Sequence, residues 1–261
     1  MTLENMQTYM HSIGFSGEVV KCVEIESANE KGNLVYITMD GYNYPIEYYI
    51  PERRDASGII NHSGMPQEYM SKYGKDFNFD LYGKDMTAVK KIINGAILNF
   101  AEYEKQGRGL YIYSKTKGSG KTMLSCVIAN EILKKNQVTC KFVSVPDYLD
   151  MYRNKDPMID RIKDASILII DDFGIQDESK DWINEIMYGL VDRRYRSLAM
   201  TIYTSNHDFT EKAISKEDRI ASRIYGSCVP IQLPEVSIRT RLADTYRKAF
   251  MQEVLTDAVS D

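Results

Sequence analysis

Residues 115–122 read Lys-Thr-Lys-Gly-Ser-Gly-Lys-Thr and lie between a short apolar run, 110–113, and an amphipathic stretch, 122–135. A strand, a glycine-rich turn and a helix in this order are the context of a phosphate-binding loop. Glycines let backbone N–H groups turn toward phosphate oxygens, and the amino end of the helix adds partial positive charge. We therefore predict that this segment binds the phosphates of a nucleotide, the alternative being a surface turn rich in glycine and lysine.

The polar residues of this loop have separate predicted tasks. Lys121 is expected to reach the β and γ phosphates, and the Thr122 hydroxyl is expected to hold Mg²⁺. The other loop residues predicted to contact the nucleotide are Lys117, Gly118, Ser119 and Gly120. The full motif has glycine at position 115, where this chain has Lys115. That departure predicts backbone strain in the loop and a reduced affinity for nucleotide.

Two carboxylates follow a second apolar run. Residues 167–172 read Ile-Leu-Ile-Ile-Asp-Asp, which is typical of a strand covered on both faces. The carboxyl ends of strands in open α/β sheets face the ligand crevice. Asp171 is therefore expected to bind Mg²⁺ through water, and Asp172 to orient or deprotonate the attacking water. Because Asp172 is one methylene shorter than glutamate, we expect slow hydrolysis.

Three further polar residues are candidates to complete this site. Asn206 follows the next predicted strand and is expected to hydrogen-bond the γ phosphate or the water, with a turn or N-cap role as the alternative. Arg219 and Arg223 lie four residues apart on one helical face. Either can reach the ATP of a neighbouring subunit as an arginine finger, unless it pairs with Glu217 or Asp218 instead.

The rest of the chain predicts two domains. Its 261 residues are 43% hydrophobic with a net charge of −4, which fits a globular protein and excludes a fold that is basic over its whole surface. Alternating apolar residues at Val35–Met39 predict a small strand-containing domain in residues 1–60. We assign residues 61–87 to a linker because the sequence around residues 51–64 is polar and turn-rich. Residues 88–261, where strand and helix patterns alternate, predict an α/β domain with a parallel sheet covered by helices.

Cysteine and hydropathy patterns indicate the compartment. The four cysteines, at positions 22, 126, 140 and 228, form no C-x-x-C pair, which argues against a zinc site and favours a reducing environment. No apolar run approaches membrane-spanning length, and the first ten residues lack the apolar core of a signal peptide. We therefore expect a cytoplasmic protein without a membrane partner.

The motifs in this order resemble the DnaC/IstB-type branch of AAA+ ATPases. The resemblance rests on residues 118–122, 169–174, 204–206 and 222–224, within a region of roughly 65–250. It implies an AAA+ P-loop three-layer fold that binds ATP and Mg²⁺ and hydrolyses ATP slowly, stimulated by a partner. It also implies that Arg223 is the arginine finger between self-associated subunits. Arg239 is implied as a second sensor that contacts the phosphates, although a solvated surface charge is the alternative.

The same resemblance implies a helicase loader in DNA replication. Members of this branch bind a hexameric replicative helicase through the N-terminal domain, here residues 1–60, and deliver it to single-stranded DNA. Two alternatives stay open. One is a transposase-associated, IstB-like ATPase that acts on duplex DNA, and the other is an ATP-gated adaptor that hardly hydrolyses ATP.

One segment independently suggests contact with single-stranded DNA. Residues 146–163 mix aromatic and basic side chains, which suits base stacking combined with phosphate contacts. The residues concerned are Tyr148, Tyr152, Arg153, Lys155, Arg161 and Lys163. The alternative is a pair of ordinary amphipathic helices.

Overall fold

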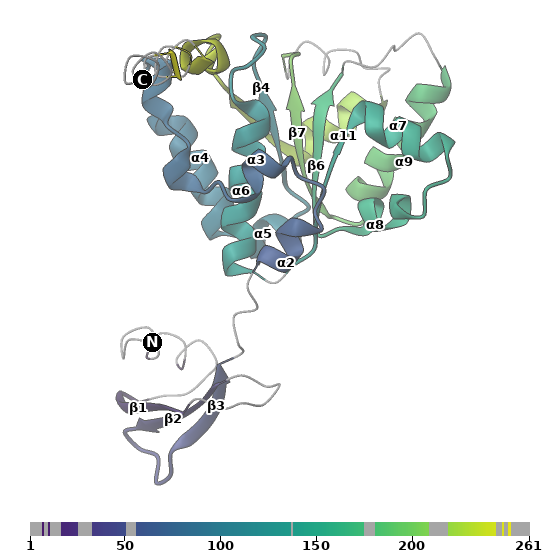
Figure 1. The fold of residues 1–261 in the computed structure, drawn as a ribbon. Coiled ribbons are helices and arrows are strands. Elements are labelled where there is room, and N and C mark those ends of the chain that lie inside the picture. Colours follow the sequence, from purple (N-terminus) through teal and green to yellow (C-terminus); the bar gives the residue numbers. More distant parts are fainter. Residues whose placement is uncertain are drawn as a thin grey trace, which may run out of the picture. The chain divides into compact units, whose positions relative to one another are not determined.

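The computed structural model describes Gln7, Met10 and residues 17–25, 33–50, 56–136, 138–174, 181–208, 219–243, 247, 250 and 251. The chain divides into two compact units, Met1–Asp55 and Ala56–Asp261 (Figure 1). In the described part of the chain, no helix is both long and apolar enough to cross a membrane.

The smaller unit contains a three-stranded antiparallel sheet. Its strands, in the spatial order β1-β2-β3, are β1 (Val19–Ile25), β2 (Asn33–Met39) and β3 (Ile46–Ile50). Ile37 and Met39 are buried on one face of this sheet against Met10. The predicted alternation is confirmed at residues 36–39, because Ile37 and Met39 are buried and Tyr36 and Thr38 are only partly buried.

The larger unit is built on a parallel sheet of five strands in the order β5-β6-β7-β4-β8. The strands are β4 (Gly109–Tyr113), β5 (Cys140–Ser144), β6 (Ile167–Phe173), β7 (Met200–Ser205) and β8 (Cys228–Gln232). The predicted α/β class is confirmed. β4 lies between β7 and β8, so strands that follow it in sequence add on both of its sides. A crevice for ligands is expected at the carboxyl end of such a strand.

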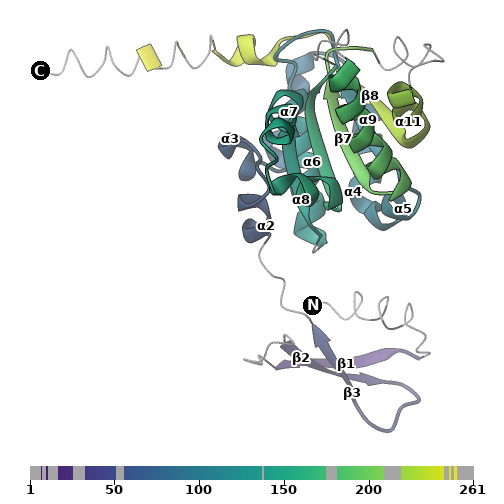
Figure 2. The ribbon, with the colours of Figure 1, turned by 90° about the vertical axis from the view of Figure 1, so that its right-hand side faces the viewer.

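Helices cover both faces of this sheet, which makes three layers (Figure 1, Figure 2). One face is covered by α2 (Ser57–Asn61), α3 (Gln67–Met70), α4 (Thr87–Leu98), α5 (Phe100–Lys105) and α6 (Lys121–Lys135). The other is covered by α7 (Val145–Arg153), α8 (Met158–Asp164), α9 (Asp181–Arg196) and α11 (Arg219–Ser227). Along β6, Ile167 and Ile169 pack on the first face, and Leu168 and Ile170 on the second. This double burial explains the uninterrupted apolar run.

Residues 61–87 belong to the core of the larger unit, so the prediction of a linker there is wrong. They include the short 3₁₀ helices η1 (Gly74–Asp76) and η2 (Phe79–Tyr82). Met65, Phe77 and Met86 are all buried in the core cluster that contains α6. These apolar residues are spaced irregularly among polar and turn-forming residues, with no helical or strand period. The sequence pattern therefore did not predict that they pack into the core.

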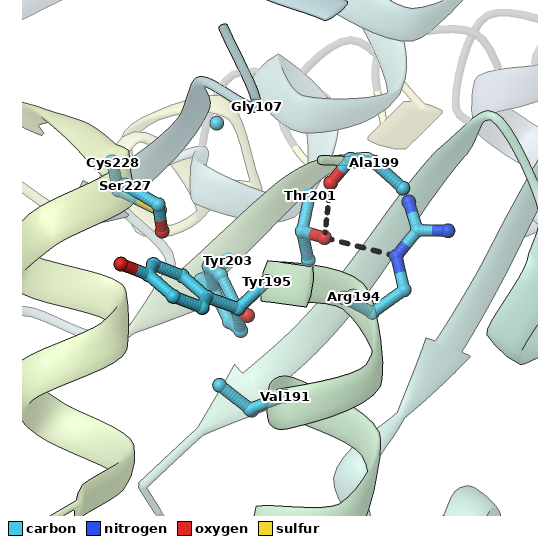
Figure 3. Close-up of a pocket in the computed structure, with 10 residues that line it drawn as sticks. Gly107, Val191, Arg194, Tyr195, Ala199, Thr201, Tyr203, Ser227 and Cys228 are labelled. Carbon is cyan, nitrogen blue, oxygen red and sulfur yellow. Dashed lines mark hydrogen bonds between the residues drawn. The ribbon is translucent and has the colours of Figure 1, made fainter. Parts of the chain in front are cut away.

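A buried arginine forms hydrogen bonds at the end of the sheet opposite to the carboxyl ends of the strands. Arg194 of α9 is only 1% exposed, and its guanidinium donates to the carbonyl oxygens of Lys163 and Met200 at 3.1 and 2.6 Å. It also donates to the carbonyl of Ala165. A further hydrogen bond goes to the Thr201 hydroxyl (Figure 3). Burial lowers the pKa of Arg194 to about 10, which leaves it charged at neutral pH. The arginine thus joins the start of β7 to the α8–β6 connection.

A small pocket lies beside this arginine (Figure 3). It is lined by Gly109, Thr201 and Cys228, which stand at or near the amino ends of β4, β7 and β8. In a parallel sheet the amino ends lie at the edge opposite to the carboxyl ends, where a ligand crevice is expected. This pocket is therefore not the predicted nucleotide site.

We predict that Arg194→Met lowers the free energy of unfolding by about 3 kcal/mol or more, because several buried carbonyl groups lose a charged donor. Urea unfolding monitored by circular dichroism measures this change. The matched control is Arg193→Met on the next residue, whose side chain is 49% exposed and pairs with Asp164 at the surface. The control should leave the unfolding midpoint nearly unchanged. Equal midpoints for the two variants would contradict the structural role of Arg194.

Candidate nucleotide-binding site

The loop between β4 and α6 depends on glycine at two positions. Gly118 and Gly120 have φ angles of 75° and 92°, in the left-handed region. A Cβ atom at Gly120 would also lie 3.3 Å from the ring of Phe77, and the Tyr82 hydroxyl donates to the carbonyl of Ser119 at 2.7 Å. The loop is thus held from one side by the segment 77–82, a contact that the sequence analysis missed.

Lys121, the first residue of α6, points back over the loop. Its Nζ donates to the carbonyl oxygens of Ser114 and Thr116 at 3.1 and 3.0 Å, and to Ser119 Oγ at 3.2 Å. Burial lowers the pKa of Lys121, and the charges of nearby carboxylates oppose that shift. A phosphate entering the loop would replace these neutral oxygens with a stronger, charged acceptor.

The predicted magnesium ligands lie together. Thr122 Oγ1 donates to Asp171 Oδ1 at 2.9 Å. Burial raises the pKa of Asp171, and the hydrogen bonds from Thr204 and Thr122 act in the opposite direction. A hydroxyl and a carboxylate are hard oxygen ligands that suit Mg²⁺. Among the residues that the structure describes, no group of three acidic, histidine or cysteine side chains could hold a metal.

Asp172 occupies a strained backbone position. Its φ is 55°, which is uncommon for a residue with a side chain, and its N–H donates to Thr204 Oγ1 at 3.0 Å. The register between β6 and β7 shifts between Ile170 and Phe173. The charge of the Asp172 carboxylate acts to raise the pKa of Lys121, but burial of the lysine outweighs it and lowers that pKa. A bulge of this kind changes the direction in which a side chain points.

Thr204 is a site residue that sequence reasoning missed. Its hydroxyl donates to Asp171 Oδ1 at 2.5 Å and accepts from the backbone of Asp172, so it orients both carboxylate residues. The sequence places Thr204 at the end of a predicted strand, which is the feature that could have identified it. The prediction for this strand end names Asn206 alone. Asn206 directly follows β7, at the same sheet edge as Asp171.

Arg239 lies against the loop. Its backbone N–H donates to the carbonyl of Gly118 at 3.1 Å. Lys117 is exposed on the same loop. The strain predicted at Lys115 is not found, because Lys115 is not among the residues with positive φ. Its N–H donates instead to Glu235 Oε1 at 2.9 Å, a further contact that sequence reasoning missed.

Arg223 is engaged within its own chain. Its Nε donates to Asp192 Oδ1 at 2.8 Å, and its guanidinium lies 4.7 Å from the ring centroid of Tyr188. Arg219 lies over the same ring at 5.7 Å and is exposed. The predicted alternative partners, residues 217 and 218, lie outside the described part of the chain. Within the described residues, the carboxylate that pairs with Arg223 is that of Asp192 in α9.

The segment 146–163 is only partly available for DNA. Tyr148 is fully buried in the core, so it is wrong as a stacking candidate. Tyr152 is 43% exposed, and Lys163 Nζ lies 5.9 Å from its ring centroid. The guanidinium of Arg153 stacks over Trp182 at 4.5 Å. Arg153, Lys155 and Arg161 are also exposed, and Lys163 is half-buried. Tyr152 and Lys163 thus form one aromatic and basic pair in contact on this segment.

Comparison with known proteins supports the resemblance inferred from the motifs. The replicative helicase loader DnaC of Escherichia coli K12 is 28% identical over 122 residues, which cover 44% of this chain and 49% of DnaC, and DnaC of Shigella flexneri matches equally. The chain thus spans about half the length of the curated relatives it matches. No protein-family model matches the sequence.

Solved structures agree on the fold. A crystal structure of the DnaC helicase loader superposes with a TM-score of 0.56 at 20% identity, over 65% of this chain and all of that one. A crystal structure of DnaI has a TM-score of 0.56 at 26% identity, over 66% of this chain and 93% of that one. DnaA bound to AMPPCP and single-stranded DNA has a TM-score of 0.50 at 18% identity, over 65% of this chain and 50% of that one. By sequence this chain is similar to DnaC over about half of its length, and by fold it has the AAA+ P-loop architecture.

Proposed function

We propose that this protein is an ATP-dependent helicase loader in DNA replication. The observation that carries the proposal is the sequence similarity to DnaC, combined with a phosphate-binding loop and paired carboxylates at one sheet edge. A separate smaller unit, Met1–Asp55, precedes the ATPase core, and its proposed task is to bind the partner. ATP binding would drive association with a replicative helicase and single-stranded DNA, and hydrolysis would release the loader in the cytoplasm.

Each site residue has a defined part in this cycle. Lys121 and the loop residues 117–120 bind the phosphates, and Thr122 and Asp171 hold Mg²⁺, which neutralises phosphate charge. Asp172 and Asn206 orient the attacking water. Hydrolysis is slow in the free protein, because the short Asp172 side chain orients the attacking water poorly until a partner completes the site.

Self-association completes that site with an arginine. Arg223 is assigned as the finger, and its side chain is held by Asp192 and only 25% exposed. Presenting it to a neighbouring subunit therefore requires α11 itself to reach that neighbour, or the contact with Asp192 to break. Arg219, one turn earlier and exposed, is the second candidate.

The first test of the proposed function concerns nucleotide binding and hydrolysis. Lys121→Ala should weaken binding of a fluorescent ATP analogue by about tenfold to hundredfold, because a charge-assisted contact with the phosphates is lost. Asp172→Asn should keep the affinity and abolish turnover. Lys105→Ala, an exposed lysine on α5, is the control. Tight binding by Lys121→Ala would contradict the site, and a wild type that binds but never hydrolyses ATP, alone or with partners, would favour the ATP-gated adaptor.

The second prediction concerns the helicase. Val23 and Tyr44 of the smaller unit are 41% and 82% exposed, so both side chains can contact a partner. Val23→Ser combined with Tyr44→Ala should weaken binding to the cognate replicative helicase, measured by pull-down with ATP and with ADP. Leu98→Ser, which removes a 69% exposed side chain from the larger unit, is the control. No binding by the wild-type chain would exclude the loader function.

The third prediction concerns DNA. Tyr152→Ala should weaken binding to single-stranded DNA by about tenfold, because one stacking contact is lost. Lys163→Ala should weaken it and also reduce the salt dependence of the affinity. Fluorescence anisotropy over a range of salt concentrations measures both effects, with Tyr225→Ala, a 56% exposed tyrosine on α11, as the control. Preference for duplex DNA would favour the transposase-associated alternative.

A further inference from the structure

The chain beyond β8 runs along the end of β4 and then along the phosphate-binding loop. The Leu233 N–H donates to the carbonyl of Tyr113 at 2.8 Å, which extends the pairing of β8 with β4 past the end of the sheet. Glu235 then meets the first half of the loop, and the Arg239 N–H donates to the carbonyl of Gly118 in its second half. Residues 233–239, which we call the strap, thus follow the loop from its start to its glycines.

Glu235 makes the central contact of the strap with its carboxylate. Oε1 accepts from the Lys115 N–H at 2.9 Å, and Oε2 accepts from Thr116 Oγ1 at 2.7 Å and from Ser114 Oγ at 3.2 Å. One side chain therefore satisfies three consecutive loop residues. Burial acts to raise the pKa of Glu235, but the hydrogen bonds from Thr116, Lys115 and Ser114 outweigh it and lower that pKa. The carboxylate is thus charged when it binds the loop at neutral pH.

These contacts account for the departure at position 115. The loop motif has glycine there, and this chain has Lys115 without a left-handed backbone. The Lys115 N–H is directed to a carboxylate of the strap, so the start of the loop is held from outside. A charged acceptor gives each of these hydrogen bonds more strength than a neutral one would.

The contacts of the strap with the loop do not depend on Lys121. Lys121 Nζ binds the carbonyls of Ser114 and Thr116, the same two residues whose hydroxyls donate to Glu235. When phosphate draws the ammonium away, those residues lose their contacts with Lys121 and keep their contacts with Glu235. The residues after Glu235 lead within one turn to Arg239 and to the helix at 238–243.

We propose that Glu235 is a positioning residue that fixes the first half of the phosphate-binding loop and couples it to the C-terminal helix that carries Arg239. The proposal rests on nucleotide binding by this loop, as proposed above. Displacement of that helix, by a partner or a neighbouring subunit, would pull Glu235 from Ser114–Thr116 and lower the affinity for nucleotide. The strap would then be the route by which partner contact regulates the site.

Two measurements on the full chain test this role. Amide hydrogen exchange in the absence of nucleotide should show faster exchange at residues 114–118 in Glu235→Ala than in the wild type, because the Lys115 N–H has lost its acceptor. Affinity for a fluorescent ATP analogue with Mg²⁺ should fall by about tenfold in the same variant. Glu235→Gln keeps an acceptor oxygen without the charge, so its values should lie between those of the wild type and the alanine variant.

Controls separate the role of Glu235 from general damage and from the proposed function. Glu104→Ala, on the exposed surface of α5, should match the wild type in both measurements. Thr116→Val removes one donor to Glu235, so its effect should be less than additive with that of Glu235→Ala. Unchanged exchange at residues 114–118 in Glu235→Ala would overturn the proposal. A wild type that binds no nucleotide would refute the proposed function instead, while the exchange measurement still decides what Glu235 does.

Discussion

The hydrogen bonds onto Asp171 are the contact on which the organisation of this site depends. Thr122 from α6 and Thr204 from β7 both donate to one carboxylate at the end of β6. Three segments far apart in sequence therefore meet through one side chain. Because Asp171 is buried, leaving its carboxylate without hydrogen bonds would destabilise the fold. The two hydrogen bonds therefore favour the arrangement in which β6, β7 and the start of α6 meet at the carboxyl edge.

The two edges of the sheet are stabilised in different ways. At the amino edge, Arg194 satisfies backbone carbonyls with a buried guanidinium and leaves little room for a ligand. At the carboxyl edge, Asp172 has a left-handed backbone, and Lys121 is held by neutral oxygens that a phosphate can replace. Contacts that a ligand can replace thus lie at the edge where ligand binding is proposed, and a buried charged network of hydrogen bonds lies at the opposite edge.

Contacts from outside the motifs also shape the loop. The segment 77–82 packs on one side of it, where the Tyr82 hydroxyl binds the Ser119 carbonyl. Glu235 and Arg239 contact it from the other end of the chain. A loop that lacks one glycine of its motif is therefore supported by two distant segments, which explains how Lys115 is accommodated without a strained φ.

The sequence by itself determined the sheet class, the phosphate-binding loop, the paired carboxylates and the resemblance to DnaC-type proteins. These features depend on local order, because a strand, a turn and a helix must follow one another for the motif to exist. Only the tertiary structure decided the places of Thr204, Tyr82 and Glu235, the intrachain pairing of Arg223 with Asp192, and the packing of residues 61–87 into the core. Each of these depends on contacts between residues distant in the chain. Periodicity and spacing carry no record of such contacts, because a hydrogen bond or a buried surface forms wherever the folded chain brings two groups together.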